Sequence, residues 1–145
     1  MKRVLSAAFV ALFAVTMSAQ WLDTPAFHSG PPPKGEKLPA ILAPAQVTGP
    51  GVDYPFQKHS YRLASRVDKV LYQQPCYCHC DKGHGHTSLR SCFESMHGAH
   101  CGICMQEAVY AYQQTKKGKT AAQIRQGIMA GDYKNVDLKA SATLK

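Results

Sequence analysis

The chain has 145 residues and a formal net charge of +8 at pH 7, with 17 lysines and arginines against 9 aspartates and glutamates. This length accommodates one domain. A charged fraction of 18% and a mean hydropathy of −0.26 exclude a protein with several membrane spans and a highly charged disordered tail. The basic residues are not interleaved with aromatic ones, so no nucleic-acid partner is expected. The GxSxG, GxGxxG and GxxxxGK[ST] motifs of hydrolases, dinucleotide-binding enzymes and P-loop kinases are also absent.

The first residues have the pattern of a secretory signal. Two basic residues at positions 2 and 3 precede an apolar run over residues 4–15, and small residues follow up to Ala19. The run is shorter than the roughly 20 apolar residues that cross a bilayer. We therefore expect residues 1–19 to be a signal peptide, with a single uncleaved amino-terminal membrane anchor as the alternative. The protein is then extracytoplasmic, that is, periplasmic, secreted or tethered by its uncleaved signal.

A proline-rich stretch follows the signal. Residues 20–55 contain eight of the nine prolines, including a triple proline at positions 31–33, and their apolar residues show no sustained period. Proline favours extended conformations, and a stretch with so little apolar surface gains too little from burial to become ordered. We expect residues 20–55 to be a disordered Pro/Gly-rich linker.

Helical periodicity begins after this linker. Apolar residues recur at helical spacing from Lys58 until Pro75 stops the helix. A loop rich in cysteine and histidine follows over residues 76–86. A short second helix, capped by Thr87 or Ser88, is expected next, because apolar residues recur there at i, i+3, i+4 and i+7.

Two further helices are expected toward the carboxyl end. The third covers about residues 100–116, and Thr120–Gln123 is a capping-box pattern that opens a fourth helix, which Gly131 ends. No stretch alternates long enough to form a sheet. The expected fold is therefore all-α: a small bundle of about four short helices over residues 56–133, followed by a frayed tail over residues 134–145.

The cysteines are concentrated in one part of this bundle. All six lie between Cys76 and Cys104, together with five of the seven histidines. A core of this size supplies only a few kcal/mol, so either disulfides or a metal ion should stabilise the domain. In an extended segment, Cys76, Cys78 and Cys80 would present their thiols on one side, where they could converge on one soft ion. A disulfide between next-but-one cysteines closes a strained, readily reduced ring, so bridges from this triplet are expected to lead to the other three cysteines.

A second cysteine motif lies at the start of the third expected helix. Cys101 and Cys104 form a CxxC, and the free N–H groups and dipole at a helix start lower the pKa of the first thiol. This spacing suits zinc, copper or redox chemistry, whereas Met105 excludes a c-type haem site, which needs histidine there. Cys92 lies on an apolar helical face and is expected to be a core thiol or a bridge partner.

Histidines extend the set of candidate ligands. Imidazole suits Zn(II) and Cu(II), and thiolate suits Cu(I), Zn(II) and Hg(II). His97 and His100 precede the CxxC, and three other histidines lie within or just after the cysteine triplet. The predicted metal ligands are Cys76, Cys78, Cys80, Cys101, Cys104, His79, His84, His86 and His100.

Three functions remain open from these residues. The first is binding of a soft or borderline metal ion (copper, zinc or mercury) through clustered thiolates. The second is an extracytoplasmic thiol–disulfide or peroxide oxidoreductase, with redox candidates Cys76, Cys78, Cys80, Cys101 and Cys104. The third is an inert interaction module, in which six cysteines form three stable disulfides in an oxidising compartment. No organic cofactor is expected in any of the three.

The spaced motifs resemble those of a known family. The run Pro75–Cys80, the spacing Gly85-His86-x-Ser88-Leu89-x-x-Cys92 and the spacing His97-Gly98-x-x-Cys101-x-x-Cys104 resemble the CYCXC family of exported bacterial (seleno)proteins, over roughly residues 58–133. That family is itself similar to the PCYCGC-motif proteins, many of which are lipoproteins. The resemblance implies a small extracytoplasmic protein. Because some members carry selenocysteine at motif positions, it also implies redox chemistry or tight capture of a soft metal at Cys76, Cys78 and Cys80. This chain has cysteine throughout and no lipobox cysteine near residue 20.

Overall fold

The structure is a computed structural model of the chain and describes residues 23–144. The expected signal peptide of residues 1–19 lies outside this range. All regular structure among the described residues is helical, as the sequence predicts. None of these helices is both long enough and apolar enough to cross a membrane.

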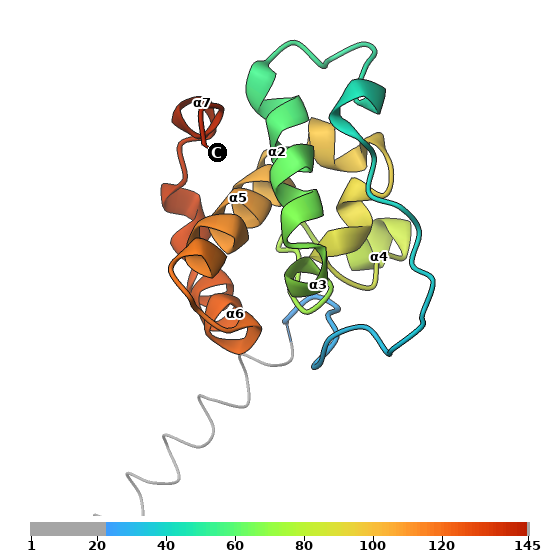
Figure 1. Cartoon of the computed structure of the whole chain (residues 1–145), viewed down its shortest axis with the longest axis vertical. Coiled ribbons are helices and arrows are strands. Elements are labelled where there is room, and N and C mark those ends of the chain that lie inside the picture. Colours follow the sequence, from blue (N-terminus) through green and yellow to red (C-terminus); the bar gives the residue numbers. More distant parts are fainter. Residues whose placement is uncertain (1–22, 145) are drawn as a thin grey trace, which may run out of the picture.

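Two helices form the centre of the fold. α2 (Pro55–Arg66) packs across α5 (Gly102–Lys116), as Figure 1 shows. Their buried apolar side chains belong to one core, which includes Tyr61, Leu63, Ala64, Ala108, Val109 and Ala111. The first expected helix is interrupted at Val67, whose φ of −130° and ψ of 28° leave the helical region, and the short α3 (Asp68–Leu71) follows.

α6 (Ala121–Ala130) begins and ends at the expected signals. The Thr120 hydroxyl accepts a hydrogen bond from the N–H of Gln123, and Oε1 of Gln123 accepts one from the N–H of Thr120 at 2.9 Å. Gly131 follows with a φ of +83°, a left-handed conformation that glycine adopts without strain. The local capping signals therefore predict this helix correctly.

The carboxyl-terminal tail is folded, although we expected it to be frayed. It forms η4 (Asp132–Asn135) and α7 (Leu138–Ser141), and α7 packs against α2 and α5. The Asp137 carboxylate caps α7 by accepting hydrogen bonds from the N–H groups of two residues in its first turn. This cap and the apolar contacts of Leu138 explain why the tail is ordered.

The segment between the first helices and α5 consists of short turns. The cysteine-rich loop contains α4 (Cys80–His84), and two 3-10 turns, η2 (Leu89–Phe93) and η3 (Met96–His100), stand where one helix was expected. Ser88, one of the two residues expected to cap this helix, occupies the N-cap position of η2, but its side chain makes no capping hydrogen bond. The hydroxyl of Ser95 accepts a hydrogen bond from the N–H of His97 at 3.2 Å, so Ser95 opens a new turn instead of continuing the helix.

Part of the expected linker packs on the bundle. Residues 23–54 are mostly irregular, with one turn, η1 (Pro44–Gln46), and they run along the helical unit in Figure 1. Val47 is buried, the N–H of Leu42 donates to the carbonyl of Phe93 at 3.0 Å, and the His28 ring stacks on Tyr72. Proline restricts the unfolded chain, so a few contacts suffice to order this segment. The described part of the linker is therefore not a free spacer.

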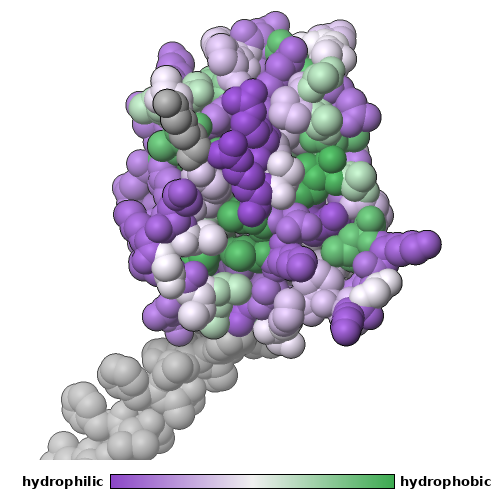
Figure 2. Space-filling model, viewed as in Figure 1, coloured by the Kyte–Doolittle hydropathy of each residue, from purple (hydrophilic) through white to green (hydrophobic). Residues whose placement is uncertain are grey.

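The surface gives little indication of a function. Polar residues cover most of the face shown in Figure 2, with small apolar areas between them. Among the described large hydrophobic side chains, Tyr54 and Ile103 are the exposed ones. Ile103 lies between the two cysteines of the CxxC, and the chemistry-bearing residues themselves are gathered in the interior beside it.

Candidate metal and redox site

Six cysteines and two histidines converge where the cysteine-rich loop, η2, η3 and the start of α5 meet. Their ligand atoms form three overlapping groups, and within each group all atoms lie within 4.8 Å of one another. The groups are Cys76, Cys78, Cys80, Cys92 and Cys104; Cys78, His97, Cys101 and Cys104; and Cys80, His86, Cys92 and His97. The described part of the chain thus contains a Cys/His cluster that can hold a metal ion.

Sulfur dominates one end of the cluster, although His97 also lies within 4.8 Å of Cys78, Cys101 and Cys104. The Sγ atom of Cys76 lies 3.4 Å from that of Cys78 and 3.4 Å from that of Cys104, and the Cys78 and Cys104 sulfurs are 3.5 Å apart. Cys101 is the N-cap of α5, where its sulfur accepts a hydrogen bond from the N–H of Cys104. The CxxC therefore lies at a helix start, as the sequence predicts. We call Cys76, Cys78, Cys101 and Cys104 the sulfur group.

The other end combines sulfur and nitrogen. Nε2 of His97 lies 3.0 Å from the Cys80 sulfur, and Nδ1 of His86 lies 3.3 Å from the Cys92 sulfur. The two sulfurs are 3.7 Å apart. We call Cys80, His86, Cys92 and His97 the mixed group.

A disulfide joins Cys78 to Cys80, and the other four cysteines are free thiols. We expected bridges from the triplet to lead to later cysteines, and this expectation is wrong for the bridge in the structure. The reason is that the segment is not extended. His79 adopts a left-handed conformation (φ 56°, ψ 37°) that turns the chain between the two cysteines and leaves their Cα atoms 5.6 Å apart.

A buried carboxyl group supports the triplet from α5. Oε1 of Glu107 accepts a hydrogen bond from the N–H of Tyr77 at 2.8 Å, and its Oε2 has no hydrogen-bond partner in the structure. Burial and the neighbouring Cys76 raise the pKa of Glu107 well above its ordinary value, which favours the neutral carboxyl group. Glu107 is not among the residues predicted from the sequence. Its position three residues after Cys104, on the same helix face, is the signal that could have identified it.

Hydrogen bonds among the thiols determine which sulfurs carry negative charge. The bond with Cys104 is the largest influence on both Cys76 and Cys101: it lowers the pKa of Cys76 well below the ordinary value, and that of Cys101 to about 6. Contact with the Cys101 and Cys76 sulfurs raises the pKa of Cys104, so Cys104 remains a thiol that donates. The lowered pKa values of Cys76 and Cys101 favour the thiolate at these two positions, the form that binds metals and attacks disulfides.

The two histidines of the mixed group favour their neutral form. Burial lowers the pKa of both His86 and His97, and the neighbouring imidazoles lower it further. Neutral imidazole is the form that coordinates metal ions. Because both side chains remain partly exposed, ions can reach them from solvent.

The predicted ligands do not all enter the groups. The five predicted cysteines and His86 do. His84 is exposed, with its ring centroid 4.5 Å from that of His97; His79 faces Tyr77; and His100 is exposed beside Gly51. Two residues outside the predicted ligand set, Cys92 and His97, belong to the groups because η2 and η3 bring them to the loop.

The position of His97 depends on packing between short turns. The Tyr61 hydroxyl donates to the carbonyl of Ser95 at 2.6 Å and accepts from the N–H of Ala99 at 3.0 Å, which ties η3 to α2. A Cβ atom on Gly98 would come within 2.9 Å of the Cys92 carbonyl oxygen, so glycine allows η3 to approach η2. Both contacts flank His97 and determine where its ring lies.

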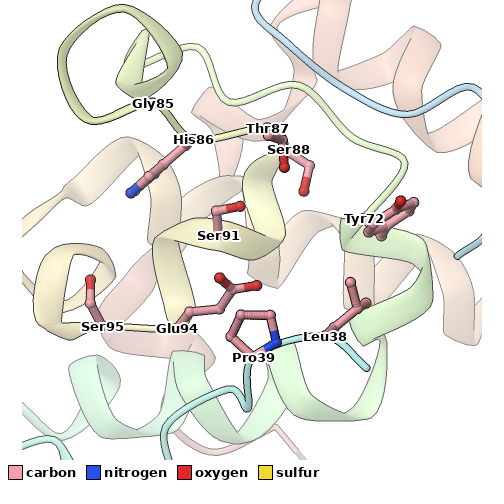
Figure 3. Close-up of a pocket in the computed structure, with 10 residues that line it drawn as sticks. All are labelled: Leu38, Pro39, Tyr72, Gly85, His86, Thr87, Ser88, Ser91, Glu94 and Ser95. Carbon is pink, nitrogen blue, oxygen red and sulfur yellow. The ribbon is translucent and has the colours of Figure 1, made fainter. Parts of the chain in front are cut away.

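A pocket of about 400 Å³ opens beside the mixed group. Figure 3 shows it between the residues around Tyr72, the stretch from Gly85 to Ser95, and Leu38 with Pro39. His86 lines one edge, and Ser88, Ser91 and Glu94 add polar atoms. His86 thus belongs both to the lining of this pocket and to the mixed group.

Comparison with known proteins identifies one family. The family model described as "Protein of unknown function with PCYCGC motif" matches residues 53–143. No curated protein and no solved structure matches the chain. The matched range contains the whole cluster and extends through α7. It also shows one departure from the motif: this chain has His79 where the letters PCYCGC have glycine.

Proposed function

The chain belongs to the family of PCYCGC-motif proteins, and from that premise we propose that it binds a soft or borderline metal ion outside the cytoplasm. Copper, zinc and mercury are the candidate ions. The observation that carries the proposal is the convergence of six sulfurs and two imidazoles in one cluster. The signal-like pattern of the first residues supports the location outside the cytoplasm.

The sulfur group is the proposed site for the softest ion. Thiolates select Cu(I) and other thiophilic ions over hard cations. Cys76, Cys78 and Cys104 present three sulfurs at mutual distances of 3.4 to 3.5 Å, and Cys101 is adjacent to Cys104. Cys76 and Cys104 are buried, which shields a bound ion from water, whereas Cys78 and Cys101 are partly exposed and allow the ion to enter. Such a site suits capture of an ion or its transfer to another thiol protein.

The test is a Cu(I) titration of the reduced protein under anaerobic conditions, in competition with a chromophoric chelator. Stoichiometric binding is expected, and replacing both buried sulfur ligands (Cys76→Ser with Cys104→Ser) should weaken it at least about a hundredfold, since even residues behind metal ligands contribute 10–100-fold. His100→Gln is the control, because His100 is exposed and outside the groups. Unchanged affinity in the double variant, or a reduced protein that holds no copper, zinc or mercury ion, would contradict the proposal.

A second candidate function rests on the Cys78–Cys80 disulfide and the low pKa of Cys101. In this reaction, a substrate dithiol passes two electrons and two protons to the disulfide: the Cys78–Cys80 bond breaks to give two thiols, and the substrate becomes a disulfide. The readout is oxidation of a reduced dithiol peptide. Oxidation of about one peptide equivalent per protein that Cys78→Ser abolishes, in a protein that binds no metal, would establish the oxidoreductase in place of the metal-binding protein.

A further inference from the structure

We infer that the cluster contains two metal sites, and that the mixed group of Cys80, His86, Cys92 and His97 is a separate site for a borderline divalent cation such as zinc. This inference deepens the proposed function and rests on it. The sulfur group and the mixed group share no residue, so the eight ligands of the cluster divide into two sets of four. The mixed group is complete for a four-coordinate ion, and the sulfur group offers the three mutually close sulfurs of Cys76, Cys78 and Cys104, with Cys101 beside Cys104.

The geometry of the mixed group fits a tetrahedral ion. Zinc binds sulfur at about 2.3 Å and imidazole nitrogen at about 2.0 Å, so tetrahedral coordination separates the ligand atoms by roughly 3.3 to 3.8 Å. The Cys80 and Cys92 sulfurs are 3.7 Å apart, and the His86–Cys92 pair is 3.3 Å apart. The His97–Cys80 pair, at 3.0 Å, needs to lengthen by about 0.5 Å to reach the roughly 3.5 Å of a tetrahedral nitrogen–sulfur pair.

The ligand chemistry distinguishes the two sites. Four sulfurs favour the softest ions, whereas two thiolates with two imidazoles form the Cys₂His₂ set of zinc sites. Both imidazole nitrogens of the mixed group point at sulfurs of that same group, His97 at Cys80 and His86 at Cys92. His97 also lies within reach of the sulfur group, but its shortest contact is with Cys80, which assigns it to the mixed group.

The structure also places a chemical link between the two sites. The Cys78–Cys80 disulfide takes one sulfur from each group. A disulfide sulfur is not a thiolate, so the bond leaves three ligands in each group. A dithiol reductant breaks the bond by supplying two electrons and two protons, and itself becomes a disulfide. Zinc then displaces the protons of Cys80 and Cys92 as it binds. Reduction is thus expected to complete both sites together.

The test is a zinc titration of the full-length protein, anaerobic and fully reduced, before and after one equivalent of Cu(I) has been loaded. We expect two ions per chain, and the Cu(I)-loaded protein should still bind one zinc. Changing both histidine ligands (His86→Gln with His97→Gln) should weaken that zinc at least about a hundredfold and leave Cu(I) binding unchanged. His84→Gln is the matched control, because His84 lies beside both rings but outside the groups.

Cobalt(II) provides a readout that does not depend on affinity. Its visible absorption bands respond to the number of thiolate ligands. Cobalt(II) added to the Cu(I)-loaded protein should therefore give the spectrum of a tetrahedral site with two sulfur and two nitrogen ligands. The double histidine variant should lose this spectrum. Far-UV circular dichroism of the metal-free variant checks that it folds. If the folded variant keeps the zinc and the cobalt spectrum, the second site is refuted while the proposed function stands. If the reduced wild-type protein binds neither Cu(I) nor zinc, both are refuted.

The effect of the Cys78–Cys80 disulfide on zinc binding is tested by comparing the oxidised and reduced proteins. Protein with the Cys78–Cys80 disulfide intact should bind zinc at least about tenfold more weakly than the reduced protein. Equal affinity in the two states would overturn the link between the bridge and the mixed group.

Discussion

The Cys80 sulfur and Nε2 of His97 lie 3.0 Å apart, although 17 positions separate the two residues in the chain. Two local features bring them together. The left-handed turn at His79 starts α4 at Cys80, and the Ser95 cap starts η3 just before His97. The site therefore depends on short turns packed around two long helices. Substitutions of the residues that maintain these turns are expected to change metal binding.

The hydroxyl of Tyr61 is expected to support the mixed group. Tyr61→Phe leaves the carbonyl of Ser95 and the N–H of Ala99 without their partner, which costs about 1–3 kcal/mol of the free energy of unfolding. Because η3 carries His97, zinc affinity should fall more than Cu(I) affinity. Denaturant unfolding and the two titrations measure these effects. Tyr54→Phe, at an exposed tyrosine, is the control, and equal behaviour of the two variants would show that Tyr61 does not position η3.

Glu107 is expected to act as a neutral acceptor. Glu107→Gln keeps an oxygen for the N–H of Tyr77 and should change the free energy of unfolding by less than about 1 kcal/mol. Glu107→Leu is similar in size but leaves that buried N–H unpaired, and should cost about 1–3 kcal/mol and weaken Cu(I) binding. Chemical denaturation of both metal-free variants gives the comparison. A glutamine variant as unstable as the leucine variant would indicate that the carboxyl group is ionised.

His79 is expected to destabilise the turn that it occupies and to contribute nothing to metal binding. It has a φ of 56° at the position where the family motif has glycine. A left-handed conformation costs a residue with a Cβ about 1–2 kcal/mol, part of which glycine loses again through its greater freedom in the unfolded chain. His79→Gly should therefore be more stable by up to about 1 kcal/mol, with unchanged metal affinity.

A matched variant separates the two roles of this residue. His79→Ala also removes the imidazole but keeps the Cβ, so it should show unchanged metal affinity and no gain in stability. A tenfold loss of Cu(I) or zinc affinity in both variants would instead make His79 a ligand, as the sequence analysis predicted.

The thiol of Cys101 is expected to react first in the reduced, metal-free protein. It is partly exposed, and the hydrogen bond with Cys104 lowers its pKa to about 6. The thiolate is the reactive form, so alkylation by iodoacetamide should rise through pH 6 and level off near neutral pH, whereas an ordinary thiol gains rate until about pH 8.5. Peptide mass mapping identifies the labelled cysteine. Labelling of Cys101 that still increases above pH 8, or that metal loading does not suppress, would contradict this assignment.

Capping residues at helix ends predicted those parts of the fold that depend on contacts within one turn. The Thr120–Gln123 capping box and Gly131 defined α6, because both act within one turn of the chain. The Asp137 cap is the same kind of local signal for α7, which was nevertheless expected to be a frayed tail. The packing of residues 23–54 could not be predicted in this way, because Val47 and Leu42 contact residues far away in sequence.

The candidate site was predicted in composition more than in arrangement. Sequence spacing was enough to identify the cysteines as candidate ligands. The direction in which each side chain points, however, depends on the short turns that carry it. Continuous helical periodicity over residues 89–96 suggested that Cys92 faces a core, and the break at Ser95 that brings His97 inward has only a single capping residue as its signal. His84 and His100 were predicted as ligands because they are near the cysteines in sequence; both are exposed, and neither belongs to the three groups.

The claim that the cluster holds metal is tested most directly by the mass of the protein, measured intact under non-denaturing conditions after anaerobic reduction and exposure to copper and zinc. The measurement is repeated after denaturation with thiol alkylation. We expect a mass increase for two bound ions, loss of both on denaturation, and alkylation of all six cysteines. A protein that carries no metal, with cysteines that resist alkylation because they remain paired in disulfides, would contradict the account. The cluster would then serve only to stabilise the fold through disulfides.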